Sequence, residues 1–445
     1  MSYYWDYIKF WRLMSKKPIS YFFFSLIFLL LLNSSSYSQL RLASPYSRFG
    51  IGDLSDNNNA WNLSMGGSSI AFRSPYHISY GNPASYTAFD SLSFVFEGGF
   101  NVDIIQLTST VQTENRNIAS VGYLLFGMPV TKWWRTSIGM VPYSRIGYNI
   151  ASPGKVGETN ILRTYSGSGG INRFYWGNAF KIIKNLSIGV NASYLFGSMN
   201  RVSTVIFPDS IYYANYKFEN HITMNDIYFN FGFQYTARLK KDLKMTVGGV
   251  FANQSKMAAK TDYLANTFAQ GSSGTEIVKD TIAFGENYSG NIVIPLMFGL
   301  GLSFDETDKW CVGADFKWQN WEKFRAIIND SVVIDESLVN AYSISVGAEF
   351  VPDVNSYSNY LKRVRYRLGF IYNSTYLELF GKHLNEYALT LGFGTPVRGS
   401  KAALNVSLQI GTRGTTDADL IRESYLKFTI GFSINERWFV KRKYY

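Results

Sequence analysis

The chain of 445 residues contains a single cysteine, Cys311, three histidines and only 11 prolines. One cysteine excludes a disulfide framework and a cysteine-based metal site within one chain. Charged residues make up 17% of the sequence, below the roughly 25% that is usual for soluble domains. Apart from Tyr21–Leu32, no apolar run approaches the roughly 20 residues that a helical membrane span needs. The sequence therefore excludes a bundle of membrane helices.

The N-terminal residues have the order of a secretory signal. Two lysines precede the apolar run Tyr21–Leu32, and small polar residues follow it. This order predicts a signal peptide over residues 1–38, cleaved before Gln39, and a start at Met14 would give it a more typical length. An uncleaved anchor helix is disfavoured because the apolar run is short. Cys311 lies far from this run, which argues against a lipid-anchored N-terminus.

Aromatic residues are abundant instead, at 17%, and many segments alternate between apolar and polar residues. In Leu426–Ile434 every even position is apolar, while Lys427, Thr429 and Ser433 are among the odd ones. Successive side chains of a strand point to opposite faces, so such a strand has one apolar and one polar face. Repeated through residues 91–434, the pattern predicts an all-β fold, a transmembrane antiparallel β-barrel with lipid outside and a hydrated lumen.

A soluble antiparallel sandwich would also alternate. Two features favour the barrel over it. The polar faces carry Lys and Asp, and six tryptophans lie close to predicted strand ends, where barrels have aromatic girdles. These tryptophans are Trp133, Trp134, Trp310, Trp318, Trp321 and Trp438.

The alternating segments number about 14, an even count as in bacterial barrels. The connections between them are predicted to be short, except for Lys256–Glu286, which we expect to be a long outer loop. The strands are predicted near 92–112, 117–130, 133–150, 161–181, 186–207, 211–236, 243–255, 287–304, 309–328, 332–350, 362–373, 385–394, 402–411 and 424–434.

The two ends of the mature chain do not alternate in this way. Residues 39–90 are rich in Ser, Asn and Gly, and we expect them to form a plug, or hatch, inside the lumen. Residues 435–445 continue past the last predicted strand and are predicted to form a C-terminal periplasmic extension.

A short motif, Asn82-Pro83-Ala84, stands between this segment and the first strand, preceded by Met65-Gly66-Gly67. Pro83 fixes φ and removes a donor, and Asn82 can bond its own backbone and close a turn. The motif is also consistent with an ordinary turn before a strand. With a small-residue stretch and then Asn-Pro-Ala just ahead of strand one, the chain resembles the FadL-type outer-membrane transport family.

This resemblance implies a 14-stranded barrel in the outer membrane of a Gram-negative cell, with the N-terminal segment folded inside. Members of the family move hydrophobic molecules, long-chain fatty acids being the best known, and release them sideways through a gap in the wall. A related branch serves the type IX secretion machinery as a scaffold or shuttle. The implied partners are thus outer-membrane lipid and a hydrophobic small-molecule ligand. A scaffold for a secreted or secretion-machinery protein and a structural porin remain alternatives.

Two sets of residues are candidates for this function. Phe72, Tyr76, Tyr80 and Tyr86 could line an apolar pocket between plug and wall, and plug packing explains them equally well. Pro129 and Pro142 lie at the end of and within predicted strands. Because proline cannot donate to the ladder, either could mark a wall kink and a lateral gap, or a simple bulge near the barrel rim.

The sequence contains little that supports catalysis or the binding of a metal, a phosphate or a nucleic acid. His77, His221 and His383 are far apart, and none belongs to a nucleophile motif. No pair of His or acidic residues has metal-ligand spacing, and the glycine-rich stretch 167–170 lacks the lysine of a phosphate loop. No basic cluster supports nucleic-acid binding. We therefore expect a passive protein, not an enzyme, without metal or cofactor.

Overall fold

The computed structural model describes residues 44–56, 58–91, 93–209, 213–271, 275–328, 331–333, 335–397 and 402–437. The chain forms two units, Met1–Gln39 and Leu40–Tyr445, and all described residues belong to the second. The predicted signal peptide and residues 438–445 of the predicted extension lie outside the described residues. None of the helices in the described part is long and apolar enough to cross a membrane.

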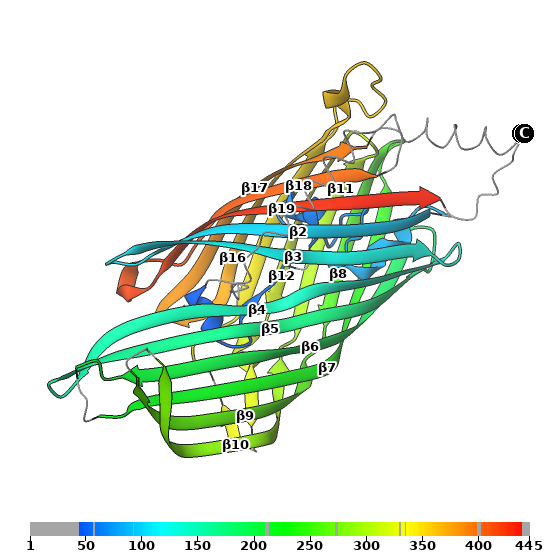
Figure 1. Cartoon of the computed structure of the whole chain (residues 1–445). Helices are drawn as coiled ribbons and strands as arrows, with labels where there is room; N and C mark the ends of the chain where they lie inside the picture. The colour runs from blue at the N-terminus through cyan, green and yellow to red at the C-terminus, as the bar shows by residue number, and fades with distance from the viewer. Residues whose placement is uncertain are drawn as a thin grey trace, which may run out of the picture. The chain divides into compact units, whose positions relative to one another are not determined.

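One antiparallel sheet closes on itself, because its last strand pairs with its first along their whole length (Figure 1). The strands that follow the plug are β2 (Ser93–Thr108), β3 (Thr113–Pro129), β4 (Trp134–Val156), β5 (Thr159–Lys181), β6 (Leu186–Ile206), β7 (Asn215–Arg238), β8 (Leu243–Ala252), β9 (Ser255–Gln270), β10 (Glu276–Ile294), β11 (Met297–Glu306), β12 (Trp310–Gln319), β13 (Arg325–Ile328), β14 (Ser331–Val333), β15 (Ala341–Phe350), β16 (Arg365–Leu379), β17 (Lys382–Pro396), β18 (Ala403–Arg413) and β19 (Arg422–Arg437).

Some of these strands are halves of one wall strand. Both β8 and β9 pair with β7, so they are two parts of one wall strand. The next wall strand is also divided in two, into β10 and β11, with a break at Pro295. The strands β12 and β15 pair with each other, and β13 and β14 continue this pair, so that β12 with β13 and β14 with β15 each form one wall strand. Each pair of halves counts as one strand, so the barrel has 14 strands, and the predicted fold is confirmed.

Three predictions need correction. Lys256–Glu286 is not a loop, because β9 and the start of β10 occupy most of it. Residues 435–437 belong to β19 and not to an extension, since they pair with β2 as far as Ser93. Trp321 is not part of an aromatic girdle, because it lies in the short helix η3 (Trp321–Lys323), is fully buried and stacks on Tyr376 with ring centroids 4.7 Å apart.

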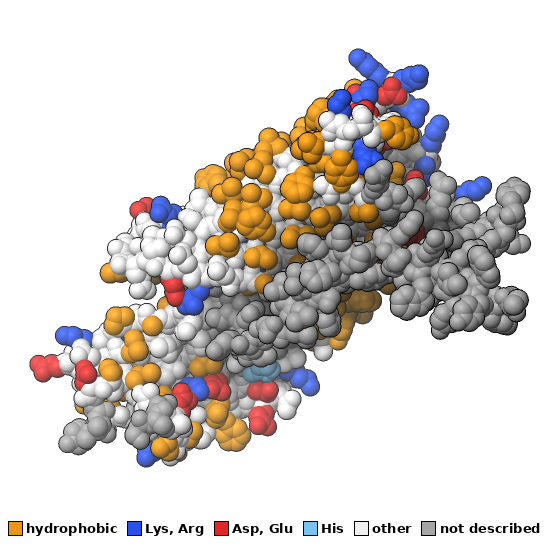
Figure 2. Space-filling model, turned by 45° about the horizontal axis from the view of Figure 1, so that its top comes forward, with side chains coloured by type: hydrophobic (Ala, Val, Ile, Leu, Met, Phe, Trp, Pro, Cys, Tyr) orange, Lys and Arg blue, Asp and Glu red, His pale blue; other side chains and the backbone are white. Residues whose placement is uncertain are grey.

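The apolar face of the wall points outward in one zone of the barrel and inward in another, as β7 illustrates. Near the β7–β8 turn, Phe229, Phe231 and Phe233 are exposed on the outside, while Asn230 and Gln234 are buried on the inside. This is the pattern of a wall in lipid, and Figure 2 shows apolar side chains gathered over one side of the barrel.

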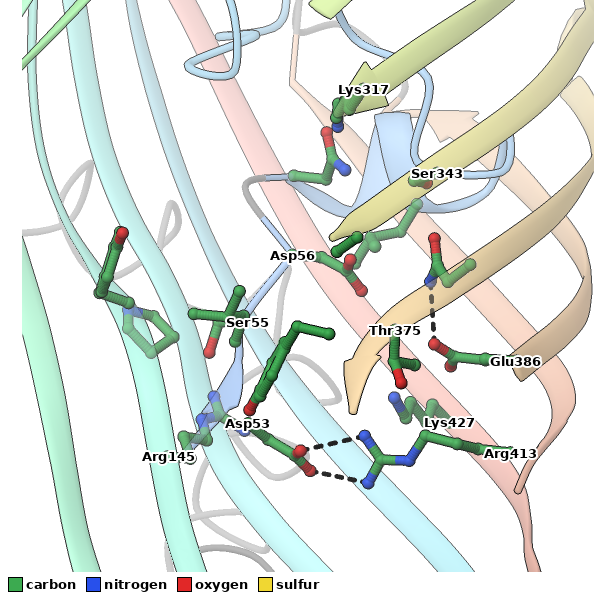
Figure 3. A pocket seen from close by; sticks show the side chains of 18 of the residues that line it. Asp53, Ser55, Asp56, Arg145, Lys317, Ser343, Thr375, Glu386, Arg413 and Lys427 are labelled. Atoms are coloured by element: carbon green, nitrogen blue, oxygen red, sulfur yellow. Dashed lines mark hydrogen bonds and ion pairs between the residues drawn. The ribbon is translucent and has the colours of Figure 1, made fainter. Parts of the chain in front are cut away.

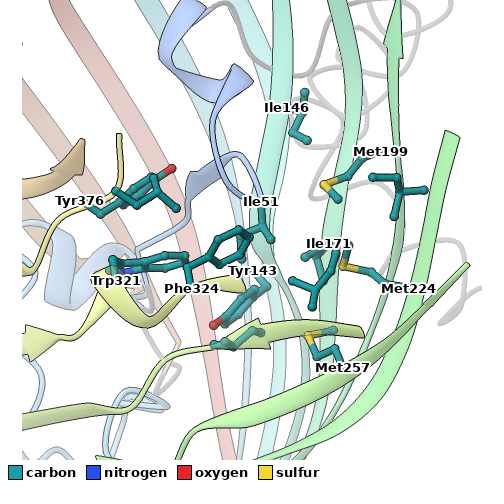
Figure 4. Packing of buried hydrophobic residues seen from close by; sticks show 14 of the residues in the cluster. Ile51, Tyr143, Ile146, Ile171, Met199, Met224, Met257, Trp321, Phe324 and Tyr376 are labelled. Atoms are coloured by element: carbon teal, nitrogen blue, oxygen red, sulfur yellow. The ribbon is translucent and has the colours of Figure 1, made fainter. Parts of the chain in front are cut away.

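Farther from that turn the pattern reverses, and the buried inward residues are apolar. They form a cluster that crosses the barrel interior, here called the distal cluster (Figure 4). Its members include Ile146, Ile171, Met199, Ile222, Met224, Met257, Trp321, Phe324 and Tyr376. Wall segments with an apolar inside and a polar outside are expected where the surroundings are water and not lipid.

The plug lies inside the barrel and contains η1 (Pro45–Arg48), β1 (Asp53–Leu54), α3 (Ala60–Leu63) and η2 (Pro83–Ala88); η4 (Tyr360–Arg363) and η5 (Asp417–Asp419) lie in wall connections. Plug atoms reach the backbone of the wall because glycines face them. A Cβ at Gly347 would lie 2.2 Å from the Met65 carbonyl oxygen. The glycines that face the plug from successive strands are Gly177, Gly189, Gly232, Gly248, Gly301, Gly313, Gly347, Gly369, Gly392 and Gly431; we call them the glycine ring.

Candidate functional site

The backbone ladder between β3 and β4 is incomplete. These strands pair only from Leu124↔Met140 to Pro129↔Arg135. Residues 113–123 of β3 and 141–156 of β4 lie outside that ladder, although these stretches pair on their other sides with β2 and β5. Figure 1 shows the two strands side by side at one end and diverging toward the other. The sheet therefore has a gap along one half of this strand pair.

The first part of the plug, Ser44–Asp56, covers the β4 edge in this gap; we call it the gap segment. In β1, Leu54 pairs with Ser144 and Asp53 with Arg145. The Ser55 amide donates to the Tyr143 carbonyl at 3.0 Å. Plug backbone thus satisfies part of the β4 edge that β3 leaves unpaired.

A buried ionic cluster ties the gap segment to β18 and β19. The Arg413 guanidinium donates two hydrogen bonds to the Asp53 carboxylate, at 3.0 and 2.8 Å, and one to Glu423 at 2.8 Å. Arg413 also donates to the Ser44 hydroxyl, which in turn donates to Glu423, both at 2.7 Å. We call these four residues the latch (Figure 3 shows its Asp53–Arg413 part). The latch holds both ends of the gap segment.

A cavity of about 370 Å³ lies beside the gap. Plug residues such as Asn58 and Tyr80 line it on one side, and members of the distal cluster such as Tyr143 and Tyr376 on the other. Gly122 and Tyr123 of β3 also contribute to its wall, as do Pro142, Tyr143 and Arg145 of β4. The cavity therefore adjoins the gap and lies between the plug and the distal cluster.

The cavity is rich in charge (Figure 3). Besides the latch, Asp56, Asp103, Lys317, Glu386 and Lys427 line it. Glu386 accepts hydrogen bonds from Asn373 at 2.8 Å and from Tyr425. The Asp56 side chain is exposed to the cavity. The loss of bulk solvent inside the barrel raises the pKa of this carboxyl, and the positive charge of Lys427 opposes that rise. The interior at this level is polar and charged.

The predicted motif Asn82-Pro83-Ala84 lies where plug meets wall. Asn82 caps η2, and its side-chain oxygen accepts from the Ala84 amide at 3.1 Å. Its Nδ2 donates to the Ile70 carbonyl at 2.7 Å and to the Phe233 carbonyl of β7 at 3.2 Å. Pro83 lies against Gly189 and Gly232. The motif thus bonds both to the plug and to the wall.

The four predicted pocket residues do not meet at one apolar pocket. Tyr80 lines the cavity and stacks on Tyr175 of β5, with ring centroids 5.9 Å apart. Phe72 is buried edge-on against Trp61, and the Tyr86 hydroxyl donates to Asn191 at 3.0 Å. Tyr76 is half-buried, and its carbonyl accepts from Asn435 of β19. Only Tyr80 of the four adjoins the cavity described above.

The two predicted wall prolines bracket the short β3–β4 ladder. Pro129 is its last residue on β3 and pairs with Arg135. Pro142 follows two residues after Met140, where the ladder stops, and a bulge in the β4–β5 pairing follows at Tyr143.

The three histidines have separate surroundings. His77 is buried, with Nδ1 2.6 Å from the Glu97 carboxylate and its ring stacked on Trp61. His221 contacts Thr223. His383 contacts the Ser374 hydroxyl at 2.7 Å, but its other nitrogen is 3.9 Å from Glu378, beyond hydrogen-bond distance. No group of three or more potential metal ligands occurs among the described residues.

Neither the latch nor the glycine ring was predicted from the sequence. Both have a detectable signal. Arg413 and Glu423 flank the β18–β19 turn, and Gly232, Gly313 and Gly431 fall on the polar face of alternating strands. Glycine at the same level of many strands indicates a backbone that approaches the wall closely.

Solved structures share this fold. The P. putida toluene transporter TodX has 16% identity and a TM-score of 0.59 over 87% of this chain and 100% of that chain. The "CymD monoaromatic hydrocarbon channel" has 15% identity and a TM-score of 0.53 over 87% of this chain and 99% of that chain. A Pseudomonas aeruginosa FadL homologue has 10% identity and a TM-score of 0.57 over 87% of this chain and 100% of that chain. At these identities the similarity shows the fold alone.

The predicted resemblance to FadL-type barrels is thereby confirmed at the level of the fold, which is that of transport barrels with a segment ahead of the first strand. No curated protein matches the chain. A family model described as BamG matches residues 14–445, almost the entire sequence. The chain therefore belongs to the BamG family.

Proposed function

We propose that this protein is an integral outer-membrane barrel through which small hydrophobic molecules pass passively between the bilayer and the barrel interior. The observation that carries the proposal is the gap between β3 and β4, which the gap segment covers and the cavity adjoins. Pro142, which has no backbone donor, stands at the end of the ladder and keeps the gap open. The hydrocarbon and toluene channels of the same fold support this reading.

The mechanism follows from the position of the gap segment. While Leu54 and Ser55 bond to β4, they occupy the edge beside the cavity. Withdrawal of the segment would expose that edge and join the cavity to the outside of the wall. A molecule would then move sideways, since the distal cluster crosses the interior on one side of the cavity and the plug lies on the other.

A disulfide lock tests this route. Leu54 and Ser144 are partners in an antiparallel ladder, where Cα atoms are about 4.5–5.5 Å apart, within the roughly 4.4–6.8 Å that disulfides span. The variant L54C/S144C, with the natural cysteine removed as C311S, should block uptake of a fluorescent hydrocarbon into liposomes when oxidised and restore it when reduced. Equal uptake in both states would exclude the gap as the route.

A matched control uses a ladder pair away from the gap. Leu302 and Ala314 are partners on β11 and β12, and both side chains are exposed on the outer face. The variant L302C/A314C in the same background should leave uptake unchanged by oxidation. If this control also blocks uptake, the effect comes from general stiffening of the barrel.

A second candidate function is docking of a partner protein, and the edge of β10 favours it. Beyond its short pairing with β13 at Gly290–Val293, β10 pairs, within the described residues, on one side only, with β9. Ile277, Val278, Ile282 and Phe284 are exposed there by 51–69%. A free edge with apolar side chains can accept an extended segment of another protein as an added strand.

Proline substitution tests this alternative. Thr281→Pro would remove a donor from β10, whereas Thr281→Ser would keep it. If the β10 edge docks a partner strand, T281P but not T281S should lose proteins that co-purify with the barrel from native membranes. Unchanged co-purification in T281P would exclude the edge, and uptake through the gap should be the same in both variants.

A further inference from the structure

We propose that the outer face of the barrel binds one anionic phospholipid. Its acyl chain lies in an apolar groove that crosses β5, β6, β7, β8 and β11, and its phosphate lies on the basic turns at the end of that groove. The inference rests on the proposed place of the barrel in a membrane and not on passage through the gap. The site is on the outside of the wall, whereas the cavity lies inside it.

The groove has a volume of about 530 Å³ and opens toward the outside of the wall, where Phe233 and Leu300 are exposed by 43% and 54%. Gly249 lies between these two residues in the ladders and carries no side chain, so the groove reaches the backbone there. A Cβ at Gly249 would lie 2.3 Å from the Phe233 ring. All residues that line the groove are apolar or glycine: Phe180, Ile188, Gly189, Val190, Phe231, Gly232, Phe233, Gly249, Val250, Phe251, Phe298, Gly299 and Leu300. A groove without polar side chains favours a hydrocarbon occupant.

The groove is as deep as one leaflet of a bilayer. From Leu300 to the end of β11 at Glu306 the strand spans roughly 20 Å, at about 3.3 Å per residue. With strands tilted by about 40°, this corresponds to a depth of roughly 15 Å, which is half of a hydrocarbon core of about 30 Å. At its other end the groove reaches Phe180, which directly precedes Lys181, the last residue of β5. An acyl chain in the groove would therefore carry its head group beside the turns.

Three turns lie side by side at that end of the groove. The Lys181 amide donates to the Trp133 carbonyl at 2.8 Å, and the Thr236 amide donates to the Asn185 carbonyl at 2.9 Å. These bonds connect the β3–β4, β5–β6 and β7–β8 turns. Ile182, in the middle turn, is exposed by 54%. Exposed apolar residues next to a large apolar surface are typical of a membrane contact, so the turns lie at the level of the head groups.

The charge of these turns is positive. Residues 130–133, 181–185 and 238–242 include one acidic residue, Asp242, and six basic residues, all with exposed side chains: Lys132, Lys181, Lys184, Arg238, Lys240 and Lys241. The turn at 305–309 on the same rim has the opposite balance, with Asp305, Glu306 and Asp308 against Lys309. Exposed lysine and arginine attract anionic lipid head groups. The excess of positive charge beside the groove therefore selects an anionic head.

Native mass spectrometry of the detergent-purified full chain tests the inference. Phosphatidylglycerol, phosphatidylethanolamine and diacylglycerol with the same acyl chains are compared at equal concentration. We expect one phosphatidylglycerol per barrel and at least fivefold weaker binding of the other two lipids. Equal binding of phosphatidylethanolamine would overturn the selection of an anionic head, and equal binding of diacylglycerol would overturn any role of the turns.

A pair of double variants locates the head group, and each removes two positive charges from exposed positions on the rim. K181Q/K184Q, beside the groove, should weaken phosphatidylglycerol binding roughly tenfold, because each lysine near an anionic head adds to the attraction. The control K309Q/K362Q changes two exposed lysines of other connections and should bind like the natural chain. Equal binding by the two variants would overturn the assignment of the phosphate to these turns.

A second pair locates the acyl chain by filling the groove with a large side chain. Val190 lines the groove, whereas Val312 of β12 is 37% exposed on the outer face and is not among the lining residues. V190W should lower phosphatidylglycerol binding at least fivefold, and V312W should leave it unchanged. Equal binding by both would overturn the groove as the place of the chain. All of these substitutions are on the outer surface, and the electrophoretic mobility of the folded barrel checks each variant.

The inference and the proposed function fail separately. If the oxidised L54C/S144C lock blocks hydrocarbon uptake but the three lipids bind alike, the lateral route stands and the phospholipid site falls. If the lock leaves uptake unchanged while phosphatidylglycerol still binds selectively, the lateral route falls and the phospholipid site stands.

Discussion

Two parts of the plug are held in place by different means. Asn58–Phe89, here called the plug core, touches the wall on many strands: Asp315 of β12 accepts from the Ser69 and Ile70 amides at 2.6 and 2.8 Å, and Glu97 of β2 accepts from Asn59 at 2.8 Å. The gap segment pairs its backbone with β4 and is tied to β18 and β19 by the latch. In addition, its Gly52 carbonyl accepts from Tyr376 at 2.7 Å, and Ile51 packs in the distal cluster.

The difference indicates which part can leave its place. Withdrawing the plug core would expose buried residues such as Met65 and Ile70 and break bonds to several strands at once. Withdrawing the gap segment requires the short ladder to β4 and the latch to open, and Tyr46 and Ile51 to leave the distal cluster. Local opening proceeds at the lowest free energy where contacts are few. We therefore expect the gap segment to open while the plug core stays in place.

The largest expected effect comes from Arg413→Ala. This change leaves the Asp53 and Glu423 carboxylates facing each other without their cation, and breaking a buried ion pair costs about 3–5 kcal/mol. Amide exchange in the gap segment, at Ser44 and Ser55, should accelerate by roughly 10²–10³-fold, since each 1.4 kcal/mol is about tenfold. Leu63 and Ser64 of the plug core should keep their rates. Hydrogen exchange followed by mass spectrometry measures both.

The matched control is Arg116→Ala. Arg116 pairs with Glu114 on β3, where the two side chains are 43% and 49% exposed. Such an exposed pair contributes about 0–1 kcal/mol, so exchange in the gap segment should not change. If Arg413→Ala accelerates amide exchange in the plug core as much as in the gap segment, the plug opens as one unit and its two parts do not differ in stability.

A smaller effect is expected from Gly347→Ala in the glycine ring. The added Cβ would lie 2.2 Å from the Met65 carbonyl oxygen, so plug core or wall must shift, and overpacking costs about 1–3 kcal/mol. The urea midpoint for loss of the folded electrophoretic mobility should fall.

The control, Gly154→Ala on β4, places its Cβ no closer than 3.6 Å to any atom and should stay within about 0.5 kcal/mol. Equal midpoints for the two variants would show that the ring does not fix the plug core.

The fold was predictable from sequence because lipid imposes a strict period. Wherever a wall strand has lipid outside and polar groups inside, as at Phe229–Tyr235, the alternation is strong and the predicted span agrees with the structure. The β9 strand was missed because there the pattern reverses: Met257 and Ala259 are buried inside, while Lys256 and Lys260 face outward. Small and charged residues in such a strand resemble those of a loop.

The candidate site was predictable only in part. Sequence can point to Pro142, which lies two residues beyond the end of the β3–β4 ladder, because a missing donor is a local property of one residue. The latch is not local, since it joins Ser44 and Asp53 to Arg413 and Glu423. Those pairs are more than 350 positions apart in the sequence, and only the closure of β19 on β2 brings them together.

The smallest expected effect, from Asp315→Asn, sharpens the comparison within the plug core. One oxygen of Asp315 accepts from both the Ser69 and Ile70 amides, and the amide of Asn can keep that oxygen in place while losing the charge. Because charge-assisted bonds are roughly twice as strong as neutral ones, we expect the free energy of unfolding to fall by about 1 kcal/mol, seen as a lower urea midpoint. Asp315→Ala, which removes both bonds, should cost more, about 2–3 kcal/mol. If the two variants lose the same amount, the charge and not the pair of bonds anchors the plug core to β12, and the plug core depends on ions as the gap segment does.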